Sequence, residues 1–463
     1  MKRIILFAFI VLIQNAYTQE KQIIKSPKVN KQVELLSIVF RLAGNKEYNA
    51  TFVKKYTDKV ESHFSAYKEH ELIKFARSLR ENNGVSYDAV VSLAVVLDDN
   101  LNPIIDFSKN LQDKRWSKDD ANKFLKLLKR FYKDADCEKF FKENAELFQD
   151  VSDRFDSVFK TLDLNWFQSF YGLNTNENFN IIVSLGCGGN NYGPSYTLNN
   201  AKKEVFAIMG TWKVDELGMP IYEKNEYLPT IIHEFNHSFI NPLLAKNEEL
   251  FEKNGKEIYN AVEYEMNQQN YKNWQIMLNE GLVRASVIKY YIDHGADETE
   301  IQIMENNESN KGFIWIKGLV DEITKYDNQR NIFPTLESYI PELSKAYESF
   351  AKKISQYDAQ RPKVESIAEF TNNDTNVNPK IKTITINFDK PLAGQGYSIN
   401  YGSKGQSAFP KLDNIHYINK NKSVVMEVHL IPGKEYQFVL TGKNFKTNQG
   451  FPLKTYEVIF KTH

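Results

Sequence analysis

Cysteine is scarce in this sequence of 463 residues, which contains only Cys137 and Cys187. Two cysteines cannot build the framework of a disulfide-rich secreted fold, so stability has to come from a hydrophobic core. They could pair with each other or remain as two inert thiols. A third alternative is that one of them occupies a metal ion and keeps an enzyme latent.

An excess of charge of one sign is also absent, because Lys plus Arg and Asp plus Glu number 59 each. Nucleic-acid-binding proteins usually carry a basic excess or patch, so this class of function has no support. Beyond the N-terminus, no apolar run approaches the length of a transmembrane helix, so we expect no membrane span. The composition, 42% hydrophobic and 25% charged, is that of a globular protein with a sizeable core.

The N-terminus has the pattern of a secretory signal peptide. A positive MKR segment precedes the apolar run Ile4–Ile13, and the small residues Ala16 and Thr18 precede Gln19. The apolar run is too short to span a bilayer, and small residues favour cleavage after position 18. We therefore predict a signal peptide at residues 1–18 and a secreted or periplasmic mature protein. A retained N-terminal anchor is the alternative.

The hydrophobic period changes along the chain and divides it into three further regions. Residues 19–177 carry apolar residues at three- and four-residue intervals, which predicts a helical lobe. Residues 178–360 begin with the short strand-like runs FNIIVSLG and KEVFAIMG and continue as helix. Residues 361–463 alternate with a period of two and contain regular turn signals, which predicts a β-sandwich. The helical lobe is expected to be integral, with a removable prosegment as the alternative.

The segment LPTIIHEFNHSFINP contains two of the eight histidines. Pro229 suits the first turn of a helix and Asn241 precedes a proline, so we expect a helix between them. His233 and His237 lie one turn apart and project from one face, where both can reach one metal ion. Glu234 lies beside them, as in the HExxH pattern of two zinc ligands and a general base. The alternative is a pair of buried histidines that hydrogen bonds satisfy.

A catalytic zinc site needs a third protein ligand and one open position. The best candidate is Glu280 in NWQIMLNEGLVRASVIKYY, because a carboxylate in an apolar helix needs a partner. Pairing of Glu280 with Arg284, one turn later, is the alternative, and both interactions can coexist. Weaker candidates for the third ligand are Glu263, Glu265 and His294.

Together, HEFNH and the later NEGLVRA resemble the motifs of gluzincin metallopeptidases, in which a glutamate completes HExxH. With VELLSIVFRLAG and YDNQRNIFPTLESYIP, they look more closely like an uncharacterised family of exported bacterial proteins taken to be zinc peptidases. That resemblance covers about residues 30–355. The segments NDTNVNPKIKTITINFDKPL and LIPGKEYQFVLTGKNFKTNQGFPL resemble a bacterial Ig-like domain of the surface-layer type.

The resemblance implies an α+β fold class, with a mainly helical zincin-like metallopeptidase domain that has a small β-sheet, followed by an all-β Ig-like sandwich. It implies a secreted zinc-dependent metallopeptidase that hydrolyses peptide bonds in peptides or proteins. His233, His237 and Glu280 would hold Zn²⁺, and Glu234 would act as the general base. The Ig-like domain would dock on a surface or glycan. In gluzincins a strand edge pairs with the substrate backbone, and KEVFAIMG is the candidate for that edge on its position alone, with a plain buried strand as the alternative.

One position departs from the gluzincin pattern. Many gluzincins have an aspartate four residues after the ligand glutamate, where it orients a ligand histidine, but this chain has Arg284. Asn279 and Asn241 are possible replacements, since such histidines nearly always donate their second N–H. The candidates for a second donor to the reacting carbonyl are Tyr259, Tyr264, His294, Tyr326 and Tyr339.

Two other functions compete with a peptidase. One is a non-catalytic exported binding protein on a peptidase scaffold, with the Ig-like domain as its docking module. The other is hydrolysis of a non-peptide amide in a cell-wall or small-molecule substrate, because the zinc motif does not fix the leaving group.

Overall fold

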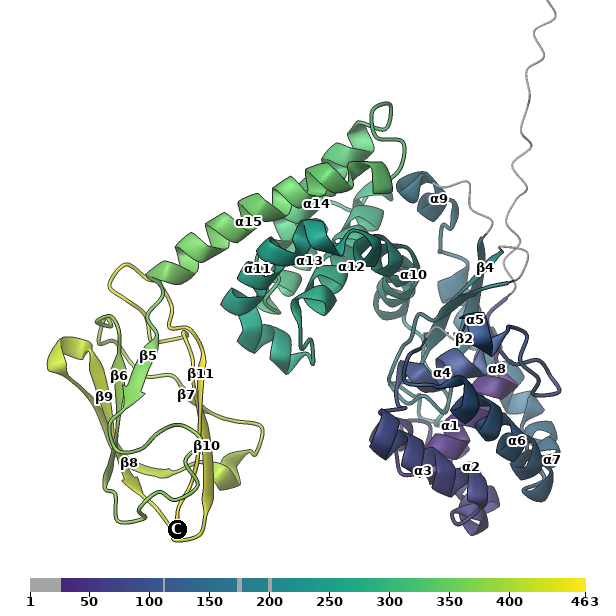
Figure 1. Cartoon of the computed structure of the whole chain (residues 1–463), viewed down its shortest axis with the longest axis horizontal. Coiled ribbons are helices and arrows are strands. Elements are labelled where there is room, and N and C mark those ends of the chain that lie inside the picture. Colours follow the sequence, from purple (N-terminus) through teal and green to yellow (C-terminus); the bar gives the residue numbers. More distant parts are fainter. Residues whose placement is uncertain (1–25, 111–112, 173–176, 199–201) are drawn as a thin grey trace, which may run out of the picture. The chain divides into compact units, whose positions relative to one another are not determined.

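The computed structural model describes residues 26–110, 113–172, 177–198 and 202–463 (Figure 1). The predicted signal peptide at residues 1–18 lies outside this part of the chain. Among the helices that are described, none is both long and apolar enough to cross a membrane. The chain divides into two compact units, and the division falls between Phe239 and Ile240, inside one helix. The two boundaries predicted from the hydrophobic period, after residues 177 and 360, stay predictions.

The region before residue 172 is helical, as its apolar period predicts. Its helices are α1 (Lys31–Leu42), α2 (Lys54–Phe64), α3 (Glu71–Asn83), α4 (Asp88–Ala94), α5 (Phe107–Asn110), α6 (Lys118–Asp134), α7 (Cys137–Glu143), α8 (Ala145–Phe159) and α9 (Asn165–Tyr171). In α6, the stripe of Phe124, Leu128 and Phe131 is fully buried, and the Ser117 side chain caps the first turn by accepting from the Asp120 N–H.

A four-stranded sheet lies in the same unit. Its strands are β1 (Lys28–Val29), β2 (Glu177–Val183), β3 (Ser195–Thr197) and β4 (Lys203–Met209), and their order is β1-β2-β4-β3. β4 is parallel to β2 and antiparallel to β3. The prediction that KEVFAIMG forms the sheet edge is therefore wrong, because this segment is β4 and has a neighbour on both sides. The segment GGNNYGPSY leads into β3, which pairs with the side of β4 that faces away from β2. β3 is therefore the outer strand at this end of the sheet.

Helix α10 (Lys224–Lys246) carries the HEFNH segment and is longer than predicted at both ends. Pro229 lies one turn inside the helix, and the helix continues through Asn241 and past Pro242. A proline inside a helix leaves the carbonyl four residues earlier without its N–H donor. Here that carbonyl belongs to Ser238, and Lys203 Nζ of β4 donates to it. This contact from a distant strand lets the helix run on.

Five helices follow in the second unit. They are α11 (Glu248–Gln268), α12 (Trp274–Asp293), α13 (Glu298–Asn310), α14 (Ile316–Asn328) and α15 (Ile340–Gln360). Helix α12 starts at a clear cap, because the Asn273 side chain accepts from the Ile276 N–H. Most residues of α12 are buried, whereas α13 has no buried residue. Helix α12 is therefore central to its unit, and α13 lies at the surface.

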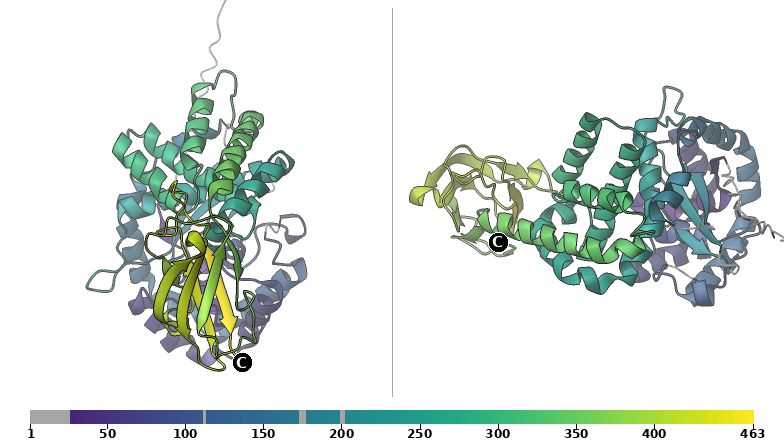
Figure 2. Two further views of the ribbon diagram at one scale, coloured as in Figure 1. Left: turned by 90° about the vertical axis from the view of Figure 1, so that its left-hand side faces the viewer. Right: turned by 90° about the horizontal axis from the view of Figure 1, so that it is seen from above.

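The last hundred residues form two antiparallel sheets, as the period of two predicts. The strands are β5 (Val364–Ile367), β6 (Thr383–Phe388), β7 (Ile399–Tyr401), β8 (Lys411–Ile418), β9 (Ser423–His429), β10 (Glu435–Leu440) and β11 (Tyr456–Lys461). One sheet has the order β5-β6-β9-β8 and the other β11-β10-β7. Figures 1 and 2 show the two sheets face to face.

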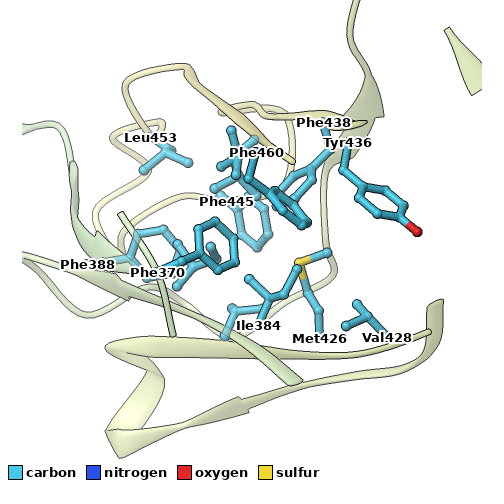
Figure 3. Packing of buried hydrophobic residues seen from close by; sticks show 14 of the residues in the cluster. Phe370, Ile384, Phe388, Met426, Val428, Tyr436, Phe438, Phe445, Leu453 and Phe460 are labelled. Atoms are coloured by element: carbon cyan, nitrogen blue, oxygen red, sulfur yellow. The ribbon is translucent and has the colours of Figure 1, made fainter. Parts of the chain in front are cut away.

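The core of this region comes from the inward side chains of both sheets (Figure 3). Ile384 and Met426 from one sheet meet Phe438 and Phe460 from the other, and all four are at most 1% exposed. Alternation of buried and half-buried residues along β6 follows from the strand period. The region is thus a β-sandwich with a hydrophobic core of its own.

Candidate metal centre

Aromatic side chains hold the middle of α10 against the sheet and the end of α9. Phe235 packs edge-on against Phe179 of β2, with ring centroids 4.9 Å apart. Phe239 stacks on Tyr171 at the end of α9, with centroids 4.3 Å apart. Helical spacing then places His233 and His237 on a different side of α10, where both are half-buried.

The two histidines converge as the HExxH spacing predicts. Their Nε2 atoms lie 3.1 Å apart, and their rings are nearly perpendicular. Two nitrogens that bind one zinc ion at tetrahedral angles lie roughly 3.3 Å apart, given bonds of about 2.0–2.1 Å. The observed separation is therefore close to what a shared ion requires.

Glu280 completes a group of three. One ligand atom from each of His233, His237 and Glu280 lies within 4.8 Å of the others, and Glu280 is buried. No other cluster of three or more His, Cys, Asp or Glu in the described ranges has this arrangement. Two imidazoles and one carboxylate are a donor set that zinc uses in catalytic sites, so the residues fit the predicted ion. The rival ligands Glu263, Glu265 and His294 are outside the group.

The predicted general base, Glu234, lies against the loop between β2 and β3. A Cβ atom on Gly193 would be 2.5 Å from the Glu234 carbonyl oxygen and 3.1 Å from Glu234 Oε2. Only glycine allows the loop backbone to come this close to the helix. The loop is itself fixed to the sheet, because the neighbouring Tyr192 exchanges two backbone hydrogen bonds with Ile208 of β4. The loop therefore forms a wall, fixed to β4 at Tyr192, beside the Glu234 side chain.

Residues 26–346 match the family model described as "Domain of unknown function (DUF4932)". The chain belongs to this family. The DUF4932 match contains His233, Glu234, His237 and Glu280, whereas the C-terminal sandwich lies beyond it. No curated protein matches the sequence.

Among solved structures, matches are to the surface layer protein SbsC. The structure of its domains 1–6 is 18% identical, with a TM-score of 0.18, and the match covers 50% of this chain and 33% of that chain. The structure of its N-terminal part is 14% identical, with a TM-score of 0.18, covering 51% and 58%. The chain thus spans a third to somewhat over half of these proteins. TM-scores this low assign neither a fold nor a function to the DUF4932 chain.

Glu280 has two hydrogen-bond donors on the same oxygen. Tyr271 Oη donates to Glu280 Oε2 over 3.0 Å, and Arg284 Nη2 donates to it over 3.2 Å. The pairing of Glu280 with Arg284, considered as an alternative to metal binding, is therefore present. It is compatible with ligation, because a carboxylate offers about four acceptor positions on two oxygens.

Arg284 also binds a second acid. Its Nη1 donates to Glu308 Oε2 of α13 over 2.6 Å, and its guanidinium lies 4.9 Å from the ring centre of Phe313. Burial works against the charged form of Arg284, but Glu308 and Glu280 outweigh burial and raise its pKa. Burial and the charge of Glu280 raise the pKa of Tyr271 to about 12, so its hydroxyl keeps the proton that it donates.

Sequence reasoning missed Tyr271 and Gly193. Tyr271 follows Asn270, whose φ of 63° turns the chain sharply after α11. This turn brings Tyr271 back beside α12. The only local signal is a turn between α11 and α12, marked by the left-handed backbone of Asn270 shortly before the cap at Asn273. A turn at this point does not reveal that Tyr271 contacts Glu280. Gly193 shows no local signal that separates it from the other glycines of its loop.

Of the predicted supporting residues, Asn279 lacks the expected contact, and two of the candidate tyrosines donate to other groups. Asn279 Oδ1 is buried and accepts no hydrogen bond from the described residues, so it does not orient a histidine here. Asn241 lies at an exposed position. The hydroxyls of Tyr259 and Tyr339 donate to the Tyr271 carbonyl and to Glu322. Tyr171 Oη of α9 donates to Asn236 Oδ1, within the HEFNH segment itself, over 2.7 Å.

Both cysteines are free and buried, so the structure contains two protected thiols and no disulfide between them. Burial raises the pKa of each thiol to about 12. Cys187 Sγ lies 3.6 Å from Ser37 Oγ of α1. Neither cysteine belongs to the group that could hold a metal.

Proposed function

We propose that this protein is an exported zinc-dependent peptidase of the gluzincin type, with a zincin-like domain followed by an Ig-like sandwich. The observation that carries the proposal is the convergence of His233, His237 and Glu280, with Glu234 next to the first histidine. A site that only binds a metal for stability does not need a carboxylate at the position of Glu234.

His233, His237 and Glu280 would hold the ion and leave a position open for water. When bound, zinc would lower the pKa of that water to near 7 and polarise the substrate carbonyl. Glu234 accepts the proton of the attacking water and delivers it to the leaving amine. The wall made by the Gly193 loop limits the rotation of the Glu234 carboxylate, so the base stays in place.

The outer edge of β3 is the candidate for binding the substrate backbone. Within the described residues, β3 pairs only with β4. An extended peptide could add to the open side as a further strand, since strand edges present unpaired N–H and C=O groups. This role replaces the one predicted for β4.

The first test combines metal content with cleavage of a mixed peptide library by purified residues 19–463. We expect about one zinc per chain. Glu234→Ala should keep the zinc and lose cleavage, whereas Glu280→Ala should lose the zinc. Glu223→Ala and His429→Ala are matched controls outside the metal group, since Glu223 pairs with Lys213 and His429 of β9 pairs with Asp413, and both should resemble the wild type.

The pairing of Glu280 with Arg284 favours a second candidate, a non-catalytic binding protein in which that ion pair is purely structural. A wild-type chain that takes up no zinc would support this second candidate and end the peptidase proposal. Zinc uptake with cleavage that Glu234→Ala leaves intact would show that Glu234 is not the base.

A further inference from the structure

Two residues, Tyr271 and Arg284, surround the candidate ligand Glu280 on the side of its Oε2 oxygen. Tyr271 Oη donates to Oε2, Arg284 Nη2 donates to the same oxygen, and Arg284 Nη2 also donates to Tyr271 Oη over 2.9 Å. The side chains of Glu280 and Arg284 are 11% and 14% exposed. The contacts thus form a closed triangle in a place where water competes little.

The position of Arg284 is fixed independently of Glu280. Glu308 of α13 accepts from Nη1, and Lys311 Nζ donates over 2.8 Å to the other oxygen of Glu308. The ring of Phe313 lies beside the guanidinium plane. Because the guanidinium is planar and rigid, holding Nη1 and one face also sets the direction of Nη2.

The charges explain why an arginine is tolerated beside a metal ligand. A lone guanidinium next to Glu280 would repel a divalent cation. Glu308 supplies one negative charge that offsets Arg284, while the positive charge of Lys311 on the other oxygen of Glu308 is 48% exposed and therefore screened by water. Glu280 can then keep its own charge for a metal, while hydrogen bonds hold one of its oxygens.

We propose that Tyr271 and Arg284, with Glu308 behind them, are positioning residues that hold the Glu280 carboxylate ready for the metal. This inference rests on the metal site of the proposed function. It assigns to an arginine and a tyrosine the orienting role that partners of metal ligands play. Groups of this kind typically change metal affinity by about 10- to 100-fold when removed.

The experiment measures the Kd for Zn²⁺ of full-length mature protein by competition with a chelator. We expect Tyr271→Phe, Arg284→Met and Glu308→Gln each to weaken binding by about 10- to 100-fold. Arg284→Lys should bind zinc more tightly than Arg284→Met but more weakly than the wild type. A lysine ammonium lacks the planar arrangement of donors with which Arg284 binds Glu308 and Glu280 at the same time. Two matched controls should bind zinc like the wild type. Arg330→Met removes an arginine over the Tyr326 ring, and Tyr339→Phe removes a tyrosine that donates to Glu322.

Two further readouts separate positioning from loss of structure. Chemical denaturation in excess chelator gives the stability of each metal-free variant, and the visible spectrum of bound Co²⁺ reports the geometry at the ion. If Glu308 acts on Glu280 only through Arg284, adding Glu308→Gln to the Arg284→Met variant should change the Kd for Zn²⁺ little further.

The outcomes are distinct. If the wild type binds zinc and the three variants bind it as tightly as the controls, the positioning role is wrong and the proposed function stands. If affinity falls only in proportion to metal-free stability, with an unchanged Co²⁺ spectrum, the residues are merely structural and the inference is overturned. If the wild type binds no zinc, both the inference and the proposed function fail.

Discussion

Replacing Gly193 by alanine tests the contact between the loop and the predicted base. The three atoms nearest to the added methyl group would all belong to Glu234, and its carbonyl oxygen would be only 2.5 Å away. Ordinary van der Waals contact begins at 3.4 Å, so loop and helix would have to separate by about 0.9 Å. The carboxylate oxygen Oε2, at 3.1 Å, would also have to move by a few tenths of an ångström.

The size of the effect follows from this crowding. Insertion of a methyl group into a packed site costs about 1–3 kcal/mol of folding free energy. A displacement of about 1 Å at a catalytic group costs up to about 10²-fold in rate. We therefore expect Gly193→Ala to lose about 1–3 kcal/mol of stability and roughly 10- to 100-fold in turnover. Its zinc content should stay unchanged, since the added methyl group meets none of the ligand atoms first.

Urea denaturation, zinc analysis and peptide turnover measure the three quantities. Gly189→Ala is a matched control from the same loop, because its methyl group would meet the Phe52 ring at 3.3 Å. That ring is 48% exposed and can move aside. If Gly193→Ala were as stable and as active as Gly189→Ala, the close approach of the loop would not control Glu234.

Three further predictions concern other parts of the first unit. Lys203→Met removes the donor to the Ser238 carbonyl, and we expect a loss of about 1–3 kcal/mol in the free energy of unfolding by urea. Burial raises the pKa of Glu34 above its ordinary value of 4.5, so the stability that its protonated form contributes is lost as pH rises through the raised pKa. Glu34→Gln should therefore flatten the decline of stability from pH 4.5 upward, and an unchanged pH profile would refute this assignment. Cys137 and Cys187 should not react with a thiol reagent at pH 8 in the folded protein, while both should react in denaturant; rapid labelling of the native chain would contradict their burial.

Local patterns determined much of the fold and of the candidate site. The spacing of His233 and His237 fixes their common face through the geometry of one helix, wherever that helix packs. Glu280 stood out because a carboxylate in an apolar helix requires a partner. The stripes of apolar residues before residue 172 and the alternation after residue 361 gave the right element types, because burial of one face imposes each period.

Contacts between distant segments decided the rest. Helix α10 continues past Pro242 because Lys203, nearly forty residues earlier, donates to the carbonyl that the proline leaves without a partner. Whether β4 lies at an edge depended on where the preceding loop and β3 settle, and no periodicity within β4 contains that information. Tyr271 and Gly193 were missed for the same reason. Their importance comes from what lies beside them in space, Glu280 and Glu234, and the sequence by itself records only spacing along the chain.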